Sequence, residues 1–282
     1  MSQKCSNCGG SKIEVIPKGR TAFAKFCSRC FQKCSQCEGS GFVFSQDSLG
    51  RMMAKDCECR SIVRKIDLFN TANVPSQYFD STFENFDVSG DPTLAEAKHA
   101  ATGAFRHYKN GTRKGLLFMG GVGVGKTRLV STMIRAFTLK YEVPCLFQEF
   151  SSLLSEIKTG YDKGLSESNV LEKINNIAIL VIDELGKGRK SDWEISILDT
   201  IISHRYNMQK TTIFTTNYTD RKSTTYSDPT SLKDKYAGNK EPEGDTLIER
   251  VFPRIYSRLK EMCVFVQING PDYRQSKDGN YL

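Results

Sequence analysis

Long apolar runs are missing from this sequence of 282 residues. No stretch of about eighteen apolar residues occurs, so the sequence predicts no membrane-spanning helix and no membrane partner. The opening residues, MSQKCSNCGG, are polar and lack the apolar core of a secretory signal. We therefore expect a cytoplasmic protein. Tryptophan is scarce as well: Trp193 is the only one, and we interpret it as a packing residue.

Cysteine is scarce outside the first 59 residues, which hold eight of the ten cysteines. Cys145 and Cys263 stand alone in strand-like apolar runs, so we interpret them as buried packing residues. Without an export signal, metal binding is a better interpretation of the other eight than disulfides. The formal net charge of +8 falls to about +4 if two four-thiolate zinc sites are included. That charge permits contact with nucleic acid but does not require it.

Two neighbouring stretches of the N-terminal region form an internal repeat. CSNCGGSKIEVIPKGRTAFAKFCSRC covers residues 5–30, and CSQCEGSGFVFSQDSLGRMMAKDCEC covers residues 34–59. Both open with C-S-x-C-x-G-S, then carry a Gly-Arg pair and Ala-Lys, and close with a second cysteine pair. The repeat predicts two copies of a β-hairpin held between cysteine pairs, in a module of residues 1–60.

The cysteine spacing in each copy is typical of structural zinc. It is C-x2-C-x18-C-x2-C in the first copy and C-x2-C-x19-C-x-C in the second. Four thiolates leave no open position on the metal, so we expect structural sites that supply much of the folding free energy. A redox pair or an iron–sulfur cluster is the weaker alternative. The expected ligands of the two zinc ions are Cys5, Cys8, Cys27, Cys30, Cys34, Cys37, Cys57 and Cys59.

The opening motif of each copy is similar to the cysteine knuckle of DnaJ-type zinc domains. That resemblance implies a nested arrangement, in which the first and fourth pairs share one ion and the second and third pairs share the other. We favour sequential pairing, because only three residues separate Cys30 from Cys34, which is tight for a shared site. Both arrangements stay open on the sequence.

A phosphate-binding loop is predicted at residues 116–127, LLFMGGVGVGKT. A strand-like run leads into G-x-x-x-x-G-K-T, and a run with helical spacing follows, which is the context that a P-loop requires. We expect Lys126 to reach the β- and γ-phosphates of ATP and the Thr127 hydroxyl to bind Mg²⁺. The predicted nucleotide-binding residues are Gly120, Gly121, Val122, Gly123, Val124, Gly125, Lys126 and Thr127.

An acidic pair ends the apolar run of residues 177–186, IAILVIDELG. The run is typical of a central parallel strand that is covered on both faces. We expect Asp183 to hold Mg²⁺ through water and Glu184 to orient and activate the attacking water. The alternative is a strand that ends in a solvated acidic turn. A further strand-like run, TTIFTTN at 211–217, places Asn217 beside the γ-phosphate if that strand neighbours the P-loop strand.

The order of motifs resembles the AAA+ ATPases of the DnaC/DnaI helicase-loader type and the related IstB-like ATP-binding proteins. The resemblance rests on the P-loop, IDELG, TTNY, ERVFPRIYSRLKEMC and GPDYR, and also on NVPSQYFDSTFENF at 73–86. It covers about residues 66–275 and implies that Asn217 is sensor 1 and that Arg274 is the sensor-2 arginine. It also implies that Arg258 is an arginine finger acting on ATP in a neighbouring subunit, hence self-association. Each arginine has the alternative of a surface ion pair.

The expected fold is α/β: a doubly wound parallel-sheet P-loop (AAA+) core with a small N-terminal zinc-bound hairpin module. The expected parts are the zinc module, a linker at 61–90 and the ATPase domain at 91–282. Residues 221–246 are polar and rich in turn formers, which predicts a loop. The strands are expected at 116–120, 143–148, 177–183, 211–217 and 263–268.

A replicative-helicase loader is the function that the resemblance implies, with the zinc module binding a hexameric helicase and the ATPase binding single-stranded DNA. In the segment 150–174, Lys158, Tyr161 and Lys163 have chemistry suited to single-stranded DNA. An ordinary exposed amphipathic helix is the equal alternative there. Two other functions stay open: an IstB-like transposition helper on duplex DNA, and an adaptor whose zinc module binds unfolded chains.

Overall fold

The computed structural model describes residues 5–31, 34–164, 166–220 and 246–274. The contacts within the chain divide it into two compact units. The first unit is Met1–Phe86 with Arg128–Phe147, and the second is Asp87–Thr127 with Gln148–Leu282. Among the described residues, no helix is long and apolar enough to span a membrane. The boundaries that we expected near residues 60 and 90 remain predictions.

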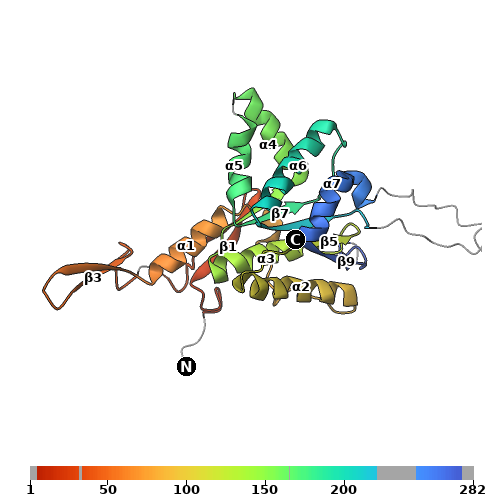
Figure 1. The fold of residues 1–282 in the computed structure, drawn as a ribbon. Coiled ribbons are helices and arrows are strands. Elements are labelled where there is room, and N and C mark those ends of the chain that lie inside the picture. The colour runs from red at the N-terminus through yellow and green to blue at the C-terminus, as the bar shows by residue number, and fades with distance from the viewer. Residues whose placement is uncertain (1–4, 32–33, 165, 221–245, 275–282) are drawn as a thin grey trace, which may run out of the picture. The chain divides into compact units, whose positions relative to one another are not determined.

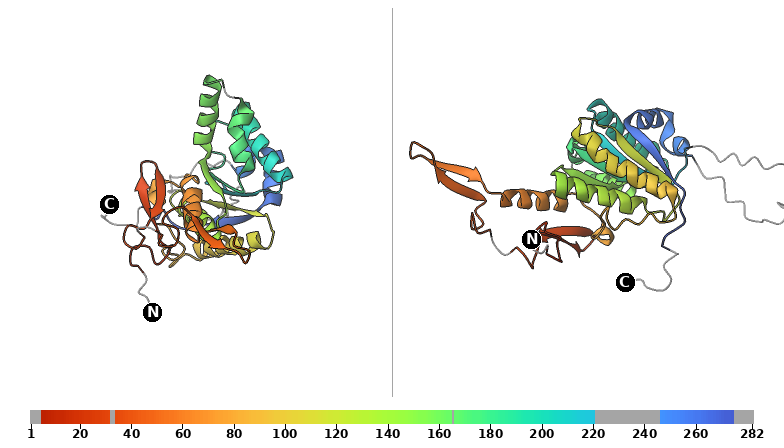
Figure 2. Two further views of the ribbon diagram at one scale, coloured as in Figure 1. Left: turned by 90° about the vertical axis from the view of Figure 1, so that its left-hand side faces the viewer. Right: turned by 90° about the horizontal axis from the view of Figure 1, so that it is seen from below.

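Two antiparallel hairpins in the first unit match the internal repeat. The first consists of β1 (Ile13–Lys18) and β2 (Thr21–Phe26), and the second of β3 (Phe42–Gln46) and β4 (Met52–Asp56). Helix α1 (Cys59–Asn70) starts at the last cysteine of the repeat, and the short helix η1 (Ser76–Tyr78) follows it. Figures 1 and 2 show the second hairpin at the N-terminal end of α1. The sequence reading treated most of α1 as linker.

A five-stranded sheet forms the base of the α/β core, in the order β6-β7-β8-β5-β9. Strand β5 pairs in parallel with β8 on one side and β9 on the other, and β8 pairs in parallel with β7. The sequence predicted all five strands within two residues of their observed ends. Their bounds are β5 Gly115–Gly120, β6 Cys145–Glu149, β7 Ile179–Asp183, β8 Thr211–Thr216 and β9 Cys263–Ile268.

Apolar sequence explains why this sheet is central. Every residue of β5, β7 and β8 is buried, as expected for parallel strands covered on both faces. A side chain at Gly115 would meet the Thr212 carbonyl oxygen at 1.7 Å, so glycine lets β5 approach β8 closely. The two isolated cysteines, Cys145 and Cys263, are buried at the starts of β6 and β9. The fold is therefore the α/β class that the sequence predicted.

The helices of the core begin where the local sequence provides caps. Asp91 caps α2, Ser191 and Glu194 form a capping box at the start of α6, and Thr246 forms another with Glu249 at the start of α7. Helix α2 contacts β5 and β9, and α7 contacts α6, β8 and β9. The bounds are α2 Pro92–Lys109, α3 Lys126–Tyr141, α4 Phe150–Asp162, α5 Glu167–Asn176, α6 Asp192–Asn207 and α7 Leu247–Met262.

A buried arginine fixes the ends of α5 and β8 to α6. Arg205 is 0 % exposed, and its guanidinium donates to the carbonyl oxygens of Ile174 and Thr211 and to the Thr212 hydroxyl. Burial lowers the pKa of Arg205 to about 9. Removing this side chain would leave several buried acceptors without donors, which is more costly than losing a surface ion pair. Helices α4 and α5, which lie side by side in Figure 1, are thereby held to the sheet.

Candidate functional site: two cysteine clusters and a nucleotide-binding edge

The eight N-terminal cysteines form two clusters, and the grouping is sequential rather than nested. The Sγ atoms within each cluster lie within 4.8 Å of one another. Sγ–Sγ distances between the opening and closing pairs are 3.9 and 3.3 Å in the first cluster and 3.5 and 3.3 Å in the second. The first cluster is Cys5, Cys8, Cys27 and Cys30, and the second is Cys34, Cys37, Cys57 and Cys59.

The donors of both clusters fit zinc. Four thiolates gathered around one point match the tetrahedral sites that structural zinc prefers. In the knuckles, backbone N–H groups turn back toward the cysteines: Gly9 N–H donates to Cys5 O at 2.8 Å, and Glu38 N–H donates to Cys34 O at 2.9 Å. Zinc would be held by cysteine alone in each cluster, and would supply a cross-link between the knuckle and the base of the hairpin.

The P-loop lies at the carboxyl end of β5, between that strand and α3. Gly123 has a φ of +77°, and a side chain there would meet an Asp272 carboxylate oxygen at 1.8 Å. Glycine is therefore required both by the backbone conformation and by the close approach of the C-terminal segment. Lys126 begins α3 and is 7 % exposed, with its Nζ atom donating to the carbonyl oxygens of Gly120 and Gly121 at 2.9 and 2.6 Å.

The electrostatics at Lys126 suit an anionic ligand. Burial lowers the pKa of Lys126 to about 8, and the nearby carboxylates of Asp183 and Glu184 act in the opposite direction. A buried ammonium that is held by neutral carbonyls gains most from a fully charged phosphate. The loop glycines and the N-terminus of α3 present backbone N–H groups of the kind that bind phosphate. The residues at this edge thus fit the triphosphate of ATP.

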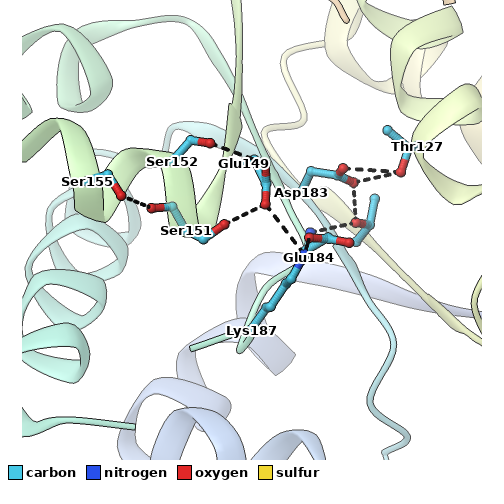
Figure 3. A network of polar contacts seen from close by, with 9 residues as sticks. Thr127, Glu149, Ser151, Ser152, Ser155, Asp183, Glu184 and Lys187 are labelled. Atoms are coloured by element: carbon cyan, nitrogen blue, oxygen red, sulfur yellow. Dashed lines mark hydrogen bonds and ion pairs between the residues drawn. The ribbon is translucent and has the colours of Figure 1, made fainter. Parts of the chain in front are cut away.

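Asp183 and Thr127 are brought together from strand β7 and helix α3. The Thr127 hydroxyl donates to both carboxylate oxygens of Asp183, at 3.2 Å each (Figure 3). The carboxylate is 6 % exposed, and its burial raises the pKa of Asp183, while bonds from Thr215 and Thr127 lower it. A hydroxyl and a buried carboxylate are the oxygen donors that Mg²⁺ prefers. These two residues would hold Mg²⁺, which would neutralise phosphate charge during hydrolysis.

Thr215 is a residue of this site that the sequence reading missed. Its hydroxyl donates to Asp183 at 2.5 Å and accepts from the Glu184 N–H at 3.0 Å. One threonine on β8 therefore fixes the carboxylate and the backbone of the acidic pair at the end of β7. The polar end of the TTIFTTN run is the sequence signal for Thr215, and it also contains Asn217.

Glu184 lies in an ion-pair network at the carboxyl edge of the sheet. Its φ of +58° is in the left-handed region, which is uncommon for a residue other than glycine and is found often at functional sites. The Lys187 ammonium pairs with the Glu184 carboxylate and lies 3.6 Å from a Glu149 oxygen (Figure 3). The bond with Glu184 raises the pKa of Lys187. Neither Lys187 nor Glu149 was singled out from the sequence.

The C-terminal segment carries Arg274 toward the P-loop. The Tyr273 N–H donates to the Gly123 carbonyl at 3.2 Å, and the Tyr273 hydroxyl donates to Asp91 at 3.0 Å. The charge of Arg274 contributes to lowering the pKa of Lys126, so the two cations are near each other. The sensor-2 role of Arg274 remains a prediction that this placement supports.

Asn217 and Arg258 lie in different surroundings. Asn217 is exposed directly after β8, which pairs with the P-loop strand β5, as its predicted role requires. Arg258 follows a kink of α7 at Phe252, directly before Pro253, and donates to Asp199 at 2.7 Å and to Ser203 at 2.5 Å, both on α6. These contacts hold it between α6 and α7, with its side chain 22% exposed. Its role in a neighbouring subunit remains a prediction.

The candidate DNA-binding residues of α4 are partly engaged. Lys158 Nζ lies 4.7 Å from the centroid of the Trp193 ring, and the Tyr161 hydroxyl donates to Glu167 at 2.6 Å. Tyr161 is 38 % exposed, and Lys163 is exposed at the end of the helix. The Trp193 ring contacts both Lys158 and Tyr161, and its interpretation as a packing residue remains a prediction. The polar stretch 221–245 lies outside the described residues.

Comparison with known proteins gives the family. Residues 25–233 match the IstB-like ATP binding protein family, which is well over half of the chain. The chain belongs to this family. It is 22% identical to the replicative helicase loader DnaI of Bacillus subtilis (strain 168) over 231 residues, which is 77% of this chain and 68% of that protein. It is 26% identical to the replicative helicase loader DnaC of Escherichia coli (strain K12) over 153 residues, 53% of this chain and 60% of that protein.

A solved structure gives the same fold. The crystal structure of the DnaC helicase loader superposes with a TM-score of 0.55 at 26% identity, over 68% of this chain and 98% of that chain. The expected resemblance to AAA+ helicase loaders is therefore confirmed, and so is the AAA+ fold. The chain spans between 55% and 68% of the length of the curated relatives that it matches.

Proposed function

We propose that this ATP-binding family member is an ATP-hydrolysing loader of a hexameric replicative helicase. The observation that carries the proposal is the match with DnaI, which covers 77% of the chain. The match with the family begins at residue 25, inside the first zinc hairpin, so the similarity is not confined to the P-loop core.

The residues at the carboxyl edge of the sheet have separate parts in hydrolysis. Lys126 and the loop backbone bind and orient the triphosphate. Asp183 and Thr127 hold Mg²⁺. Glu184 accepts a proton from the attacking water, and its ion pair with Lys187 leaves carboxylate lone pairs available for that step. Asn217 orients that water from the end of β8.

Self-association of the chain supplies a further positive charge at the bound ATP. Arg258 is paired with Asp199, and its side chain is 22% exposed. If the ATP of a neighbouring subunit replaces Asp199 as the partner of Arg258, the guanidinium lies where negative charge develops during hydrolysis. Hydrolysis by the isolated chain is then slow, and assembly on single-stranded DNA raises it. The zinc hairpins bind the helicase.

The test is size-exclusion chromatography with light scattering. The full chain would be mixed with the hexameric replicative helicase of its host, with ATP and Mg²⁺, and with or without single-stranded DNA. A defined complex supports a loader. Absence of any complex, together with filaments on duplex DNA, would replace the loader by the IstB-like transposition helper. The Lys126→Ala variant is the control for dependence on nucleotide.

A further inference from the structure

The two zinc hairpins are copies of each other in register as well as in sequence. Val15 pairs with Ala24 in the first, and Phe44 pairs with Ala54 in the second. Aligning the cysteines that close each hairpin places Ala54 at the position of Ala24 and Met52 at the position of Ala22. Equivalent residues therefore face the same way, and the covering of one hairpin can be compared directly with that of the other.

One face of the first hairpin is buried within its own unit. Ile13, Val15, Ala22 and Ala24 share this face and are at most 9 % exposed. Helices α1 and η1 both contact β2. The hairpin thus packs against the end of a helix and the segment that follows that helix.

The edge of β2 is also occupied. The Asn70 side chain accepts from the Ala24 N–H at 2.7 Å and donates to the Ala24 carbonyl at 3.0 Å. The Ala22 N–H donates to the Val74 carbonyl at 2.8 Å, and the Ser76 N–H donates to the Arg20 carbonyl at 3.0 Å. Residues 74–76 therefore pair with the edge of β2 through an isolated antiparallel bridge between Thr21 and Pro75, and a helix end precedes them.

The same face of the second hairpin is open. Phe44 is 62 % exposed and Met52 is 64 % exposed, and every residue of β4 is exposed. Cys37, Cys57 and Cys59 form a buried cluster of their own, in the group of four cysteines that would hold zinc. The apolar face is thus not needed for the core of its own hairpin. Exposed apolar side chains beside a free strand edge are typical of a surface that binds another chain.

We infer that the β3–β4 hairpin is a docking site for a partner protein, which presents a helix end followed by an extended segment. The extended segment adds to the edge of β4 at Ala54, and the helix end covers Phe44 and Met52. These are the two elements that cover the first hairpin, so the occupied copy within the chain serves as the template for the open copy. That this partner is the replicative helicase rests on the proposed function.

The charges of the hairpin favour a protein over nucleic acid. The open face carries Phe42, Phe44, Ala54 and Met52, and Lys55 lies on the opposite face with Met53. Arg60 lies over the Phe42 ring at 4.6 Å, so this cation covers one of the two rings. Arg51 is paired with Asp47 at 2.9 Å. Binding of single-stranded nucleic acid needs open rings among cations that reach phosphates, and this face does not offer that arrangement.

Neighbouring methionines provide a matched test in the full chain. The double variant Phe44→Ser/Met52→Ser makes the open face polar, and Met53→Ser makes the same change on the opposite face, where Met53 is 48 % exposed. A third variant, Ala54→Pro, removes the outward N–H of the strand edge. Zinc content and affinity for a fluorescent ATP analogue should stay at wild-type values, because these residues are exposed and distant in sequence from the P-loop.

Affinity for the host's hexameric helicase, measured by interferometry, is the first readout. We expect the double variant and Ala54→Pro to lose about tenfold or more, and Met53→Ser to lose less than about twofold. Equal binding by the wild type and the double variant would overturn the docking site and leave the loader proposal standing. Loss of single-stranded DNA binding in the double variant, with helicase binding intact, would overturn it in favour of nucleic acid.

A second readout separates the two proposals if the wild type does not bind the helicase. A photo-crosslinking amino acid in place of Phe44 reports what lies on the face in cells of the host. Cross-links to a helix end with an extended segment of one protein, lost with Met52→Ser and kept with Met53→Ser, would support the docking site and reject the helicase as its occupant. Absence of such cross-links would overturn the docking site.

Discussion

Replacement of Thr215 by valine tests how the acidic pair is held. Valine keeps the branched shape but removes the hydroxyl that donates to Asp183 and accepts from the Glu184 N–H. A hydrogen bond to a charged group contributes about 1.5–3 kcal/mol and a neutral one about 0.5–1.5 kcal/mol. Asp183 keeps its two bonds from Thr127. We therefore expect a loss of about 2 kcal/mol in the free energy of unfolding.

Urea denaturation followed by tryptophan fluorescence measures this loss. Trp193 is the only tryptophan, and its ring lies 6.4 Å from that of Tyr161, edge to face, so its emission reports unfolding of the unit that contains Thr215. With a urea dependence of about 2 kcal/mol per M, the midpoint should fall by about 1 M. Thr200→Val is the control, because its exposed hydroxyl bonds only within α6, and its midpoint should barely move.

The same variant should also change the requirement for Mg²⁺. A carboxylate that is no longer fixed binds the ion less well, and a loss of about 1.4 kcal/mol corresponds to a tenfold higher Mg²⁺ concentration for half-maximal ATP hydrolysis. Thr215→Ser restores the hydroxyl and should restore the Mg²⁺ requirement. If Thr215→Val keeps both the wild-type midpoint and the wild-type Mg²⁺ requirement, Thr215 does not position Asp183.

Three other predictions concern the zinc clusters, the P-loop lysine and the arginine on α7. Chelation of zinc should unfold both hairpins, which hydrogen exchange would detect as loss of their amide protection. Affinity for an ATP analogue should change by less than about twofold. Hairpins that stay protected after complete removal of zinc would contradict a structural role for the metal. The affinity of the protein for nucleotide should fall as the pH rises through about 8. Burial lowers the pKa of Lys126 to about 8, and the neutral amine binds phosphate poorly. A nucleotide affinity that stays constant from pH 7 to 9.5 would contradict this prediction. Mixing Arg258→Ala with Lys126→Ala subunits should restore part of the ATPase activity if Arg258 acts across an interface. Neighbouring subunits in the mixture then combine one intact P-loop with one intact arginine. ATPase activity no higher than that of the separate variants would limit Arg258 to its contact between α6 and α7 of the same chain.

Lys126 should also change how protein stability depends on pH, in the direction opposite to its effect on nucleotide affinity. Because the pKa of Lys126 is lower in the folded protein than its ordinary value, the unfolded chain binds more protons between pH 8 and the usual lysine range. The contribution of Lys126 to the free energy of unfolding therefore rises with pH in that window. In Lys126→Met, this rise should be absent.

Local sequence determined much of the site and of the fold. The residues from Gly120 to Thr127 are contiguous, so their spacing alone specifies a loop between a strand and a helix. Strands β5 and β7 are recognisable in the sequence because fully buried parallel strands are continuous apolar runs bounded by polar residues. The cysteine pairs were recognisable because each knuckle is a local turn, and the repeat made the hairpins visible.

Tertiary structure alone decided the contacts between distant segments. Thr215 comes 32 residues after Asp183, and Glu149 ends β6 whereas Lys187 follows β7, so no local pattern links either pair. The sheet order sets β8 beside β7, and this brings the threonine to the acidic pair. The sequential grouping of the cysteines was likewise open on spacing and is fixed by which Sγ atoms converge.

The two hairpins show most clearly what cannot be predicted from the sequence alone. Their residues match in spacing and register, and the sequence predicts the same hairpin twice. Only the packing of α1 and residues 74–76 against β2 makes one copy part of a core and leaves the other exposed. Burial of a hairpin depends on whether a distant segment of the chain covers it, because the hydrophobic effect is proportional to the apolar surface removed from water. The apolar sequence pattern of the hairpin does not by itself specify that covering segment.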